Sequence, residues 1–164
     1  MEIREAEASD AEAMSDLLQE LIAAGARENR ADADFALSHY IHHPHRLHCF
    51  VAIDDEGKIL GLQSLKRAHA GNSYGTQVGW GIIGTHVRPS AARRGIGSRL
   101  FAATLTGARA AGLPAIEAYI GQGNKAALDY YEALGFRTHR RPEGIVCKVL
   151  RLSAADAESR RLGA

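Results

Sequence analysis

The stretch VRPSAARRGIGSRL, residues 87–100, indicates how the middle of the chain is organised. Strand-like residues lead up to Pro89, and apolar residues at helical spacing follow from Ile96. A helix that begins here directs the free N–H groups of its first turn, and the positive end of its dipole, at one point. Gly95 and Gly97 would let the backbone approach a bulky anion with no Cβ in the way. The stretch therefore predicts an anion site suited to a pyrophosphate.

The charge distribution agrees with an anionic partner. No Asp or Glu occurs from Gly57 to Ile116, whereas this segment holds eight Lys and Arg residues. Because the whole chain has a net charge of +1, the remaining residues sum to −7. Aromatic residues make up 6% of the chain and are not interleaved with the arginines, which argues against nucleic acid. A phosphorylated cofactor is the better prediction.

Working outward from this segment, the pattern predicts one α/β domain over residues 1–152 and a polar tail at 153–164. The expected order is β-α-α-β-β-β-α-β-α-β-β, which implies a mixed, mostly antiparallel central sheet flanked by about four helices. The expected strands and helices cover residues 2–4, 9–24 (helix), 32–41 (helix), 47–53, 58–66, 76–87, 95–111 (helix), 115–120, 124–134 (helix), 137–141 and 145–152.

A second motif, NKAALDYYEALGF at residues 124–136, follows at the next helix. Together the two motifs resemble those of the GNAT acetyltransferases. The family's first signature is Gln/Arg-x-x-Gly-x-Gly/Ala, and both glycines match here, although Ala92 stands at its first position. The second, Asn-x-x-Ala-x-x-x-Tyr-x-x-x-Gly-Phe, matches at every fixed position.

The resemblance implies an N-acetyltransferase that uses acetyl-CoA as cosubstrate and needs no metal. Tyr131 would protonate the departing thiolate, which suits a phenol with a pKa near 10. A backbone N–H of the strand that ends at Val87 would polarise the thioester carbonyl. The residues expected to bind the cofactor are Thr85, Val87, Ala92, Arg93, Arg94, Gly95, Ile96, Gly97, Ser98, Asn124, Ala127 and Tyr131.

The general base is the main departure from the family. GNAT enzymes often carry a glutamate at positions that correspond here to Gly81 and Tyr119, neither of which is acidic. Glu117, on the same strand face as Tyr119, and His86 are the candidate replacements. Deprotonation through water, without a dedicated residue, is an equal alternative. A catalytically inert acyl-CoA-binding or sensing module on the same fold is the alternative function.

The acceptor is a primary amine of a small molecule or of a protein. The acidic residues outside the cofactor segment favour a cationic amine. The resemblance also allows a homodimer. The N-terminal residues lack the apolar core of a signal peptide, and no run of about 20 apolar residues occurs, so we expect a cytoplasmic protein without a membrane span.

Three further patterns have simpler explanations. Residues 79–84 spell GxGxxG, but strand residues follow instead of a helix, so we expect a bulge or an approach of a ligand to the strand. The histidines around Pro44 indicate a loop at the edge of the acceptor pocket instead of a metal site. Cys49 and Cys147 are expected to be buried free thiols.

Overall fold

The computed structural model describes residues 1–27 and 30–152, so the predicted tail at 153–164 lies outside the described residues. The predicted order of elements and the α/β class are confirmed. The strands and helices are β1 (Glu2–Glu5), α1 (Ala11–Ala23), α2 (Ala33–Ala36), β2 (Arg46–Ile53), β3 (Ile59–Arg67), β4 (Gly81–Val87), α3 (Ile96–Ala110), β5 (Ala115–Gly121), α4 (Lys125–Ala133), β6 (Arg137–Arg140) and β7 (Ile145–Arg151). A π-helical turn, Leu37–Ile41, continues α2, and a 3-10 turn, Pro89–Ala91, lies between β4 and α3.

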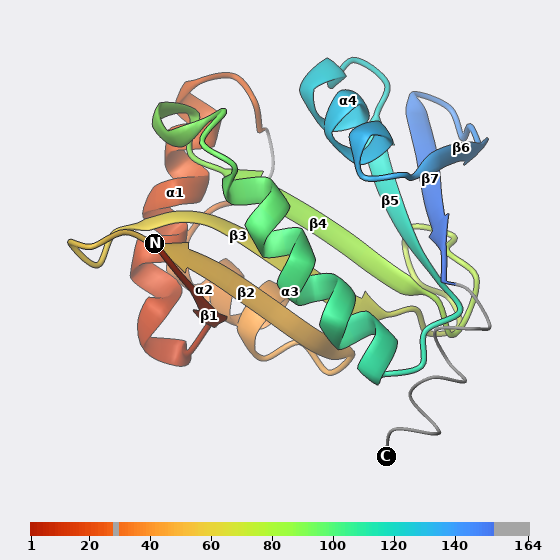
Figure 1. The fold of residues 1–164 in the computed structure, drawn as a ribbon, viewed down its shortest axis with the longest axis horizontal. Coiled ribbons are helices and arrows are strands. Elements are labelled where there is room, and N and C mark those ends of the chain that lie inside the picture. Colours follow the sequence, from red (N-terminus) through yellow and green to blue (C-terminus); the bar gives the residue numbers. More distant parts are fainter. Residues whose placement is uncertain (28–29, 153–164) are drawn as a thin grey trace.

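The seven strands form one sheet in the order β1-β2-β3-β4-β5-β7-β6. Every neighbouring pair is antiparallel except β4 and β5, which are parallel. A parallel pair needs a crossover connection, and α3 supplies it. Figure 1 shows β4 and β5 side by side at one end and diverging toward the other.

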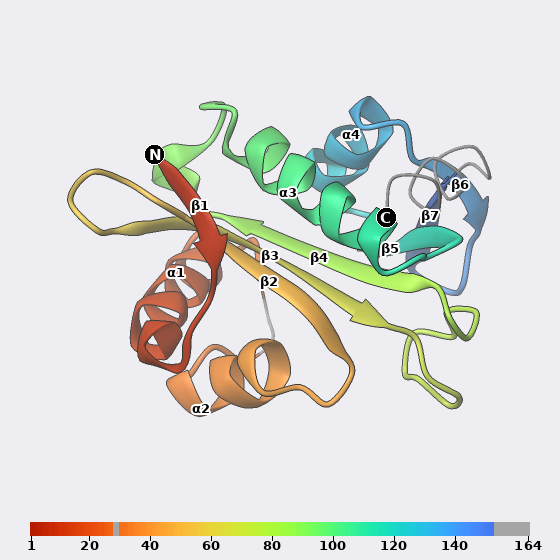
Figure 2. The same cartoon turned by 60° about the horizontal axis from the view of Figure 1, so that its bottom comes forward.

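Two helices cover each face of the sheet, as Figure 2 shows: α1 and α2 lie on one face, α3 and α4 on the other. The core under α1 and α2 contains Met14 and Leu17 packed with Val51. The core under α3 and α4 joins Phe101 and Phe136 in a single buried cluster with strand residues such as Ile116. The amphipathic spacing that predicted these helices thus reflects burial on opposite faces of one sheet.

One predicted strand is too long. Residues 76–87 were expected to be extended throughout, but β4 begins only at Gly81. A loop closes immediately before it, where Ala68 N–H donates to Trp80 O (2.8 Å) and Gly79 N–H donates to Ala68 O (2.9 Å). Gly79 has a φ of +90°, which is a left-handed conformation that strands do not use.

The expected bulge is also absent, since β3 and β4 pair in continuous register from Arg67–Gly81 to Gly61–Val87. The strand glycines instead provide space. A Cβ at Gly81 would lie 2.8 Å from Leu113 and 2.9 Å from Leu65. A Cβ at Gly84 would meet only Ser64 Oγ, at 3.2 Å, on the face toward α2.

Cys49 and Cys147 are buried and free, as predicted. No helix in the part of the chain that the structure describes is long and apolar enough to cross a membrane.

Candidate active site

The site is organised by the opening between β4 and β5. These strands pair at only three positions, Gly81–Ile116, Ile82–Glu117 and Ile83–Ala118. Beyond them β4 continues to Val87 beside β3, and β5 continues to Gly121 beside β7. The two strands therefore diverge while each keeps its other neighbour, and Figure 1 shows the resulting gap between their ribbons.

Backbone donors point into this opening from β4. The N–H of Arg88 donates to Leu60 O on β3 (2.8 Å). Because successive N–H groups of a strand alternate between its two edges, those of Thr85 and Val87 point the other way, toward β5. The two residues expected to contribute to the cofactor site on this strand are thus the two that face the opening.

The loop between β4 and α3 has an unusual backbone conformation. Arg93 has a φ of +62° and Gly95 a φ of +74°, so two left-handed residues precede the start of α3 at Ile96. No atom lies within 4 Å of a Cβ built on Gly95, which leaves the concave side of the loop open. Arg88 anchors the start of the loop, because its Nη1 donates to Glu20 Oε2 (2.7 Å) and its Nε to Ile59 O (2.6 Å).

Successive N–H groups around residues in left-handed conformations, followed by the first turn of a fifteen-residue helix, are an arrangement that can bind an anion. The expected cofactor residues Ala92, Arg93, Arg94 and Ser98 are exposed around this loop, while Ile96 is buried beneath it. The binding of a pyrophosphate here stays a prediction.

The motif suggested that Gly97 lets the backbone approach an anion, but in the structure Gly97 makes room for the side chain of Tyr130. A Cβ there would lie 2.7 Å from the ring of Tyr130, so the residue allows α3 and α4 to approach each other. The Tyr130 hydroxyl donates to Gly97 O (2.8 Å) and accepts from Gln63 Nε2 (3.0 Å). Sequence reasoning missed Tyr130, because the family pattern does not fix that position.

Tyr131 lies at the opening on the side of α3 and α4. Its hydroxyl shares a hydrogen bond with Thr85 Oγ1 (2.7 Å), and only 4% of the residue is exposed. Burial raises the pKa of Tyr131 above its usual range, so the phenol is protonated at neutral pH and can donate. Asn124 caps α4 by accepting from Ala127 N–H (3.1 Å), which fixes the start of the helix that carries Tyr131.

A hollow of about 520 Å³ lies on the opposite face, bordered by α2 and the π-helical turn that continues it. Gly84, His86 and Tyr119 border it from the two diverging strands. The rest of its lining is Arg27, Arg30, Phe35, His39, Tyr40, Ser64, Lys66, Tyr74, Ile82 and Ile83. His86 Nε2 and the Tyr40 hydroxyl share a hydrogen bond (3.2 Å), and burial lowers the pKa of His86 to about 3. The imidazole is therefore neutral near pH 7.

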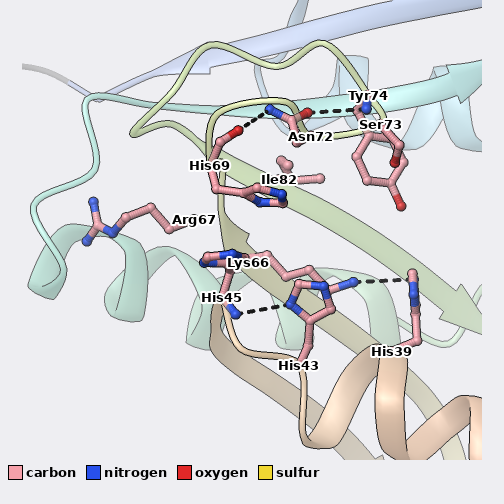
Figure 3. A pocket seen from close by; sticks show the side chains of 10 residues that line it. All are labelled: His39, His43, His45, Lys66, Arg67, His69, Asn72, Ser73, Tyr74 and Ile82. Carbon is pink, nitrogen blue, oxygen red and sulfur yellow. Dashed lines mark hydrogen bonds between the residues drawn. The ribbon is translucent and has the colours of Figure 1, made fainter.

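A smaller hollow of about 190 Å³ adjoins the first, and the two share His39, Lys66, Tyr74 and Ile82. His43, His45 and His69 also line it (Figure 3), and the rings of His45 and His69 stack at 4.1 Å. Among residues 1–27 and 30–152, no three His, Cys, Asp or Glu side chains come together as a metal site would require. Of the histidines around Pro44, His43 and His45 line this hollow. His42 is in neither lining, and His48 lies beside Glu5.

Glu117 is placed for structure. Its carboxylate accepts from Thr76 Oγ1 (2.8 Å) and Arg140 Nη2 (2.5 Å), bonds the ring of His139, and is absent from the lining of both hollows. The residue is 1% exposed. Burial alone would raise the pKa of this carboxyl, but the hydrogen bonds from Arg140, His139 and Thr76 outweigh burial and lower it.

Comparison with known proteins agrees with this geometry. The model of the acetyltransferase (GNAT) family matches residues 12–136. Mycothiol acetyltransferase from Streptomyces avermitilis is 36% identical over 90 residues, which are 55% of this chain and 27% of that protein. The aligned part thus spans about a quarter of the length of that relative.

Solved structures share the fold over nearly the whole chain. A GCN5-related N-acetyltransferase from Kribbella flavida has a TM-score of 0.74 at 22% identity, covering 92% of this chain and 97% of its own. The yncA protein from Salmonella typhimurium, solved with its cofactor acetyl-CoA, has a TM-score of 0.73 at 22% identity, with 93% and 94% covered. Ribosomal-protein-alanine N-acetyltransferase from Brucella melitensis gives 0.73 at 20% identity, with 93% and 100% covered.

The Glu117 network can be tested through stability. We expect Glu117→Gln to lower the free energy of unfolding by about 3 kcal/mol at pH 7, because it leaves Arg140 without its buried partner. A carboxyl with a lowered pKa in the folded state stabilises above its unfolded pKa, roughly 4.3, and that contribution is lost as the pH falls. Urea unfolding should therefore show a difference between wild type and variant that shrinks below about pH 4.3. A difference independent of pH would contradict an ionised Glu117.

Proposed function

Because the chain belongs to the acetyltransferase (GNAT) family, we propose that it transfers the acetyl group of acetyl-CoA to a primary amine by direct attack. One observation carries this proposal: the opening between β4 and β5 has a donor hydroxyl on one face and a hollow on the other. A thioester in the opening would be reached by an amine from the hollow, while Tyr131 stands on the side where the thiolate departs. We further propose that the protein acts in the cytoplasm, as predicted from its sequence.

The loop at residues 88–95 and the first turn of α3 would hold the pyrophosphate of acetyl-CoA. The support is the left-handed pair Arg93 and Gly95, the open space at Gly95 and the row of N–H groups that follows. The N–H groups of Thr85 and Val87 would receive the extended arm at the strand edge and polarise the thioester carbonyl. Asn124 and Ala127 would border the arm from the start of α4.

In the transfer step, the amine nitrogen forms a bond to the acetyl carbon and the carbon–sulfur bond breaks. The hydroxyl of Tyr131 gives its proton to the departing sulfur, and the proton returns to the phenolate from solvent. The raised pKa of Tyr131 keeps the phenol protonated until the thiolate departs, and the short distance from its hydroxyl to Thr85 places it at the opening.

The proton of the amine goes to water. Glu117 is tied into its ion-pair network, and a histidine whose pKa is about 3 holds a proton poorly at neutral pH. His86 would instead accept a hydrogen bond from the amine and orient it. Of the alternatives left open by the sequence, deprotonation through water fits these surroundings best.

Tyr131→Phe tests the acid. We expect kcat to fall about 100-fold with a smaller change in KM, because only the proton donor is removed. The measurement is thiol release from acetyl-CoA, detected with a chromogenic disulfide over a panel of amines. Tyr130→Phe, which loses a hydroxyl one residue away, should instead weaken acetyl-CoA binding, since its partner is Gly97 O on the loop side. Binding of acetyl-CoA without turnover of any amine would favour the inert binding module.

Gly95→Ala tests the loop. A Cβ at a φ of +74° strains the backbone and turns the N–H groups away, so we expect the Kd for acetyl-CoA to rise at least tenfold in calorimetry. Gly57→Ala is the matched control, because Gly57 also has a positive φ (+84°) and open space around it but lies in the turn between β2 and β3. Equal Kd values for the two variants would rule out a role of the loop in binding.

The role of His86 can be tested through pH. If His86 orients the amine without taking its proton, His86 should cause no inflection in the dependence of kcat on pH between pH 5.5 and 7.5. The profiles of the wild type and of His86→Gln should then have the same inflections in this range. The variant should keep the shape of the profile while its kcat is lower. An inflection near pH 6–7 that disappears in His86→Gln would restore this histidine as the general base.

A further inference from the structure

The further inference starts from the buried charges. Five ionisable side chains in the described ranges are buried and belong to residues normally charged at neutral pH: Asp10, Lys66, Arg88, Glu117 and Lys148. Four of them have an opposite charge in contact. The pairs are Asp10 with Arg4 (2.8 Å), Arg88 with Glu20 (2.7 Å), Glu117 with Arg140 (2.5 Å) and Lys148 with Glu132 (2.6 Å). Lys66 differs from all four.

Lys66 is 7% exposed, the same as Lys148, yet no carboxylate lies within salt-bridge distance of it in residues 1–27 and 30–152. Its Nζ contacts His39 Nε2 (3.3 Å) and lies 5.7 Å from the centre of the Tyr40 ring. Figure 3 shows the side chain extending from β3 toward His39, while the neighbouring Arg67 points away. Arg67 donates to Ala111 O on the other side of the sheet.

The ammonium group lies where the two hollows meet, and among the described residues neither lining contains an Asp or Glu. The expectation of a cationic acceptor, drawn from the acidic residues elsewhere in the chain, therefore has no support in these linings. Burial lowers the pKa of Lys66 to about 8, which still leaves it mostly charged at pH 7. Burial also lowers the pKa of His39 to about 4, so its nearest partner is neutral.

A buried charge without a partner is costly, and an opposite charge brought by a ligand offsets that cost. Lys66 is thus a buried cation whose counter-ion the described part of the chain does not provide, positioned in the wall of the proposed acceptor hollow. Lys148 is equally buried, but its charge is paired with the carboxylate of Glu132.

We propose that the acceptor carries an oxyanion, a carboxylate or a phosphonate, which binds Lys66 while its amine reaches the opening at Gly84. This inference rests on the proposed acetyl transfer. In the β3–β4 register Lys66 lies opposite Ile82 and Ser64 opposite Gly84. The backbone positions of Lys66 and Gly84 are therefore about 7 Å apart along the strands, and the Lys66 side chain extends from there toward His39. An amine and an oxyanion joined by a short carbon chain fit this spacing, which selects a small amino acid-like molecule.

The first experiment measures stability and does not depend on catalysis. Lys66→Met removes the uncompensated charge with little change in length, so we expect the melting temperature to rise by about 2–4 °C. Lys148→Met is the matched control and should lower it, because the bonds of this ammonium to Glu132 and Thr138 are lost. 4-Aminobutyrate and 3-aminopropylphosphonate, as probes, should each raise the melting temperature of the wild type and leave that of Lys66→Met unchanged. Equal destabilisation by the two substitutions, or no probe effect that depends on Lys66, would overturn the proposal.

The second experiment compares matched acceptors by thiol release from acetyl-CoA. L-amino acids are paired with their carboxamides, 4-aminobutyrate with 4-aminobutanamide, and 3-aminopropylphosphonate with 1,4-diaminobutane. In each pair that turns over, the member that carries an oxyanion should have the higher kcat/KM. Lys66→Met should raise the KM of that member at least tenfold while changing the KM of the member without an oxyanion less than twofold. Lys66→Arg, which keeps the charge, should retain most of the preference.

The outcomes separate the two proposals. Turnover with a preference for neutral or dicationic amines would overturn the oxyanion site and leave acetyl transfer standing. Probe binding that depends on Lys66, without turnover of any amine, would support the oxyanion site and count against acetyl transfer.

Discussion

The arrangement of the site depends on where the hydrogen bonding between β4 and β5 stops. Three paired positions hold the two strands parallel, and beyond Ile83 and Ala118 they diverge. The divergence is stable because β3 and β7 continue to pair with their outer edges, so that neither strand loses its position in the sheet. Backbone N–H groups that an intact sheet would satisfy internally are left facing the gap. An extended ligand can bond to such groups in the manner of an added strand. The divergence of the two strands is therefore a source of backbone donors between the two faces of the sheet.

The alternation of side chains along β4 then distributes the chemistry between the two faces. Thr85 points toward α3 and α4, where its hydroxyl meets that of Tyr131 (2.7 Å). Gly84 and His86, its neighbours on either side, point into the hollow on the opposite face. Successive residues of one strand can therefore serve the departing thiol and the arriving amine separately. The loop that follows β4 lies on the side of the departing thiol, because it leads directly into the start of α3.

Much of this follows from the sequence. Local patterns predict the order of strands and helices, the glycine-bearing loop before α3 and the helix that carries Tyr131, because glycine conformation, helix starts and amphipathic spacing are set by near neighbours in the chain. The sequence misled where tertiary contacts decide. The strand predicted from residue 76 begins at Gly81, because backbone bonds between Ala68 and Gly79–Trp80 close a loop first. Glu117 has the residue type of a base, but Arg140 and His139, about 20 residues away in the chain, fix it in an ion-pair network. Lys66 gave no signal at all, since an uncompensated charge can be recognised only when its surroundings are known.

The absence of a family glutamate and the cationic lining of the hollow are physically connected. A carboxylate beside the acceptor amine would stabilise its protonated form and raise its pKa, and would then have to take the proton itself. In residues 1–27 and 30–152 no Asp or Glu lines the hollow, and Lys66 disfavours a second positive charge nearby. In such surroundings the ammonium form of a bound amine is disfavoured, so its proton is lost to water more readily. A lysine that holds an oxyanion at one end of the acceptor would therefore also promote the free amine at the other. Without substrate, the protein then has an unpaired buried charge, which lowers its stability. Functional sites commonly lower the stability of a protein in this way.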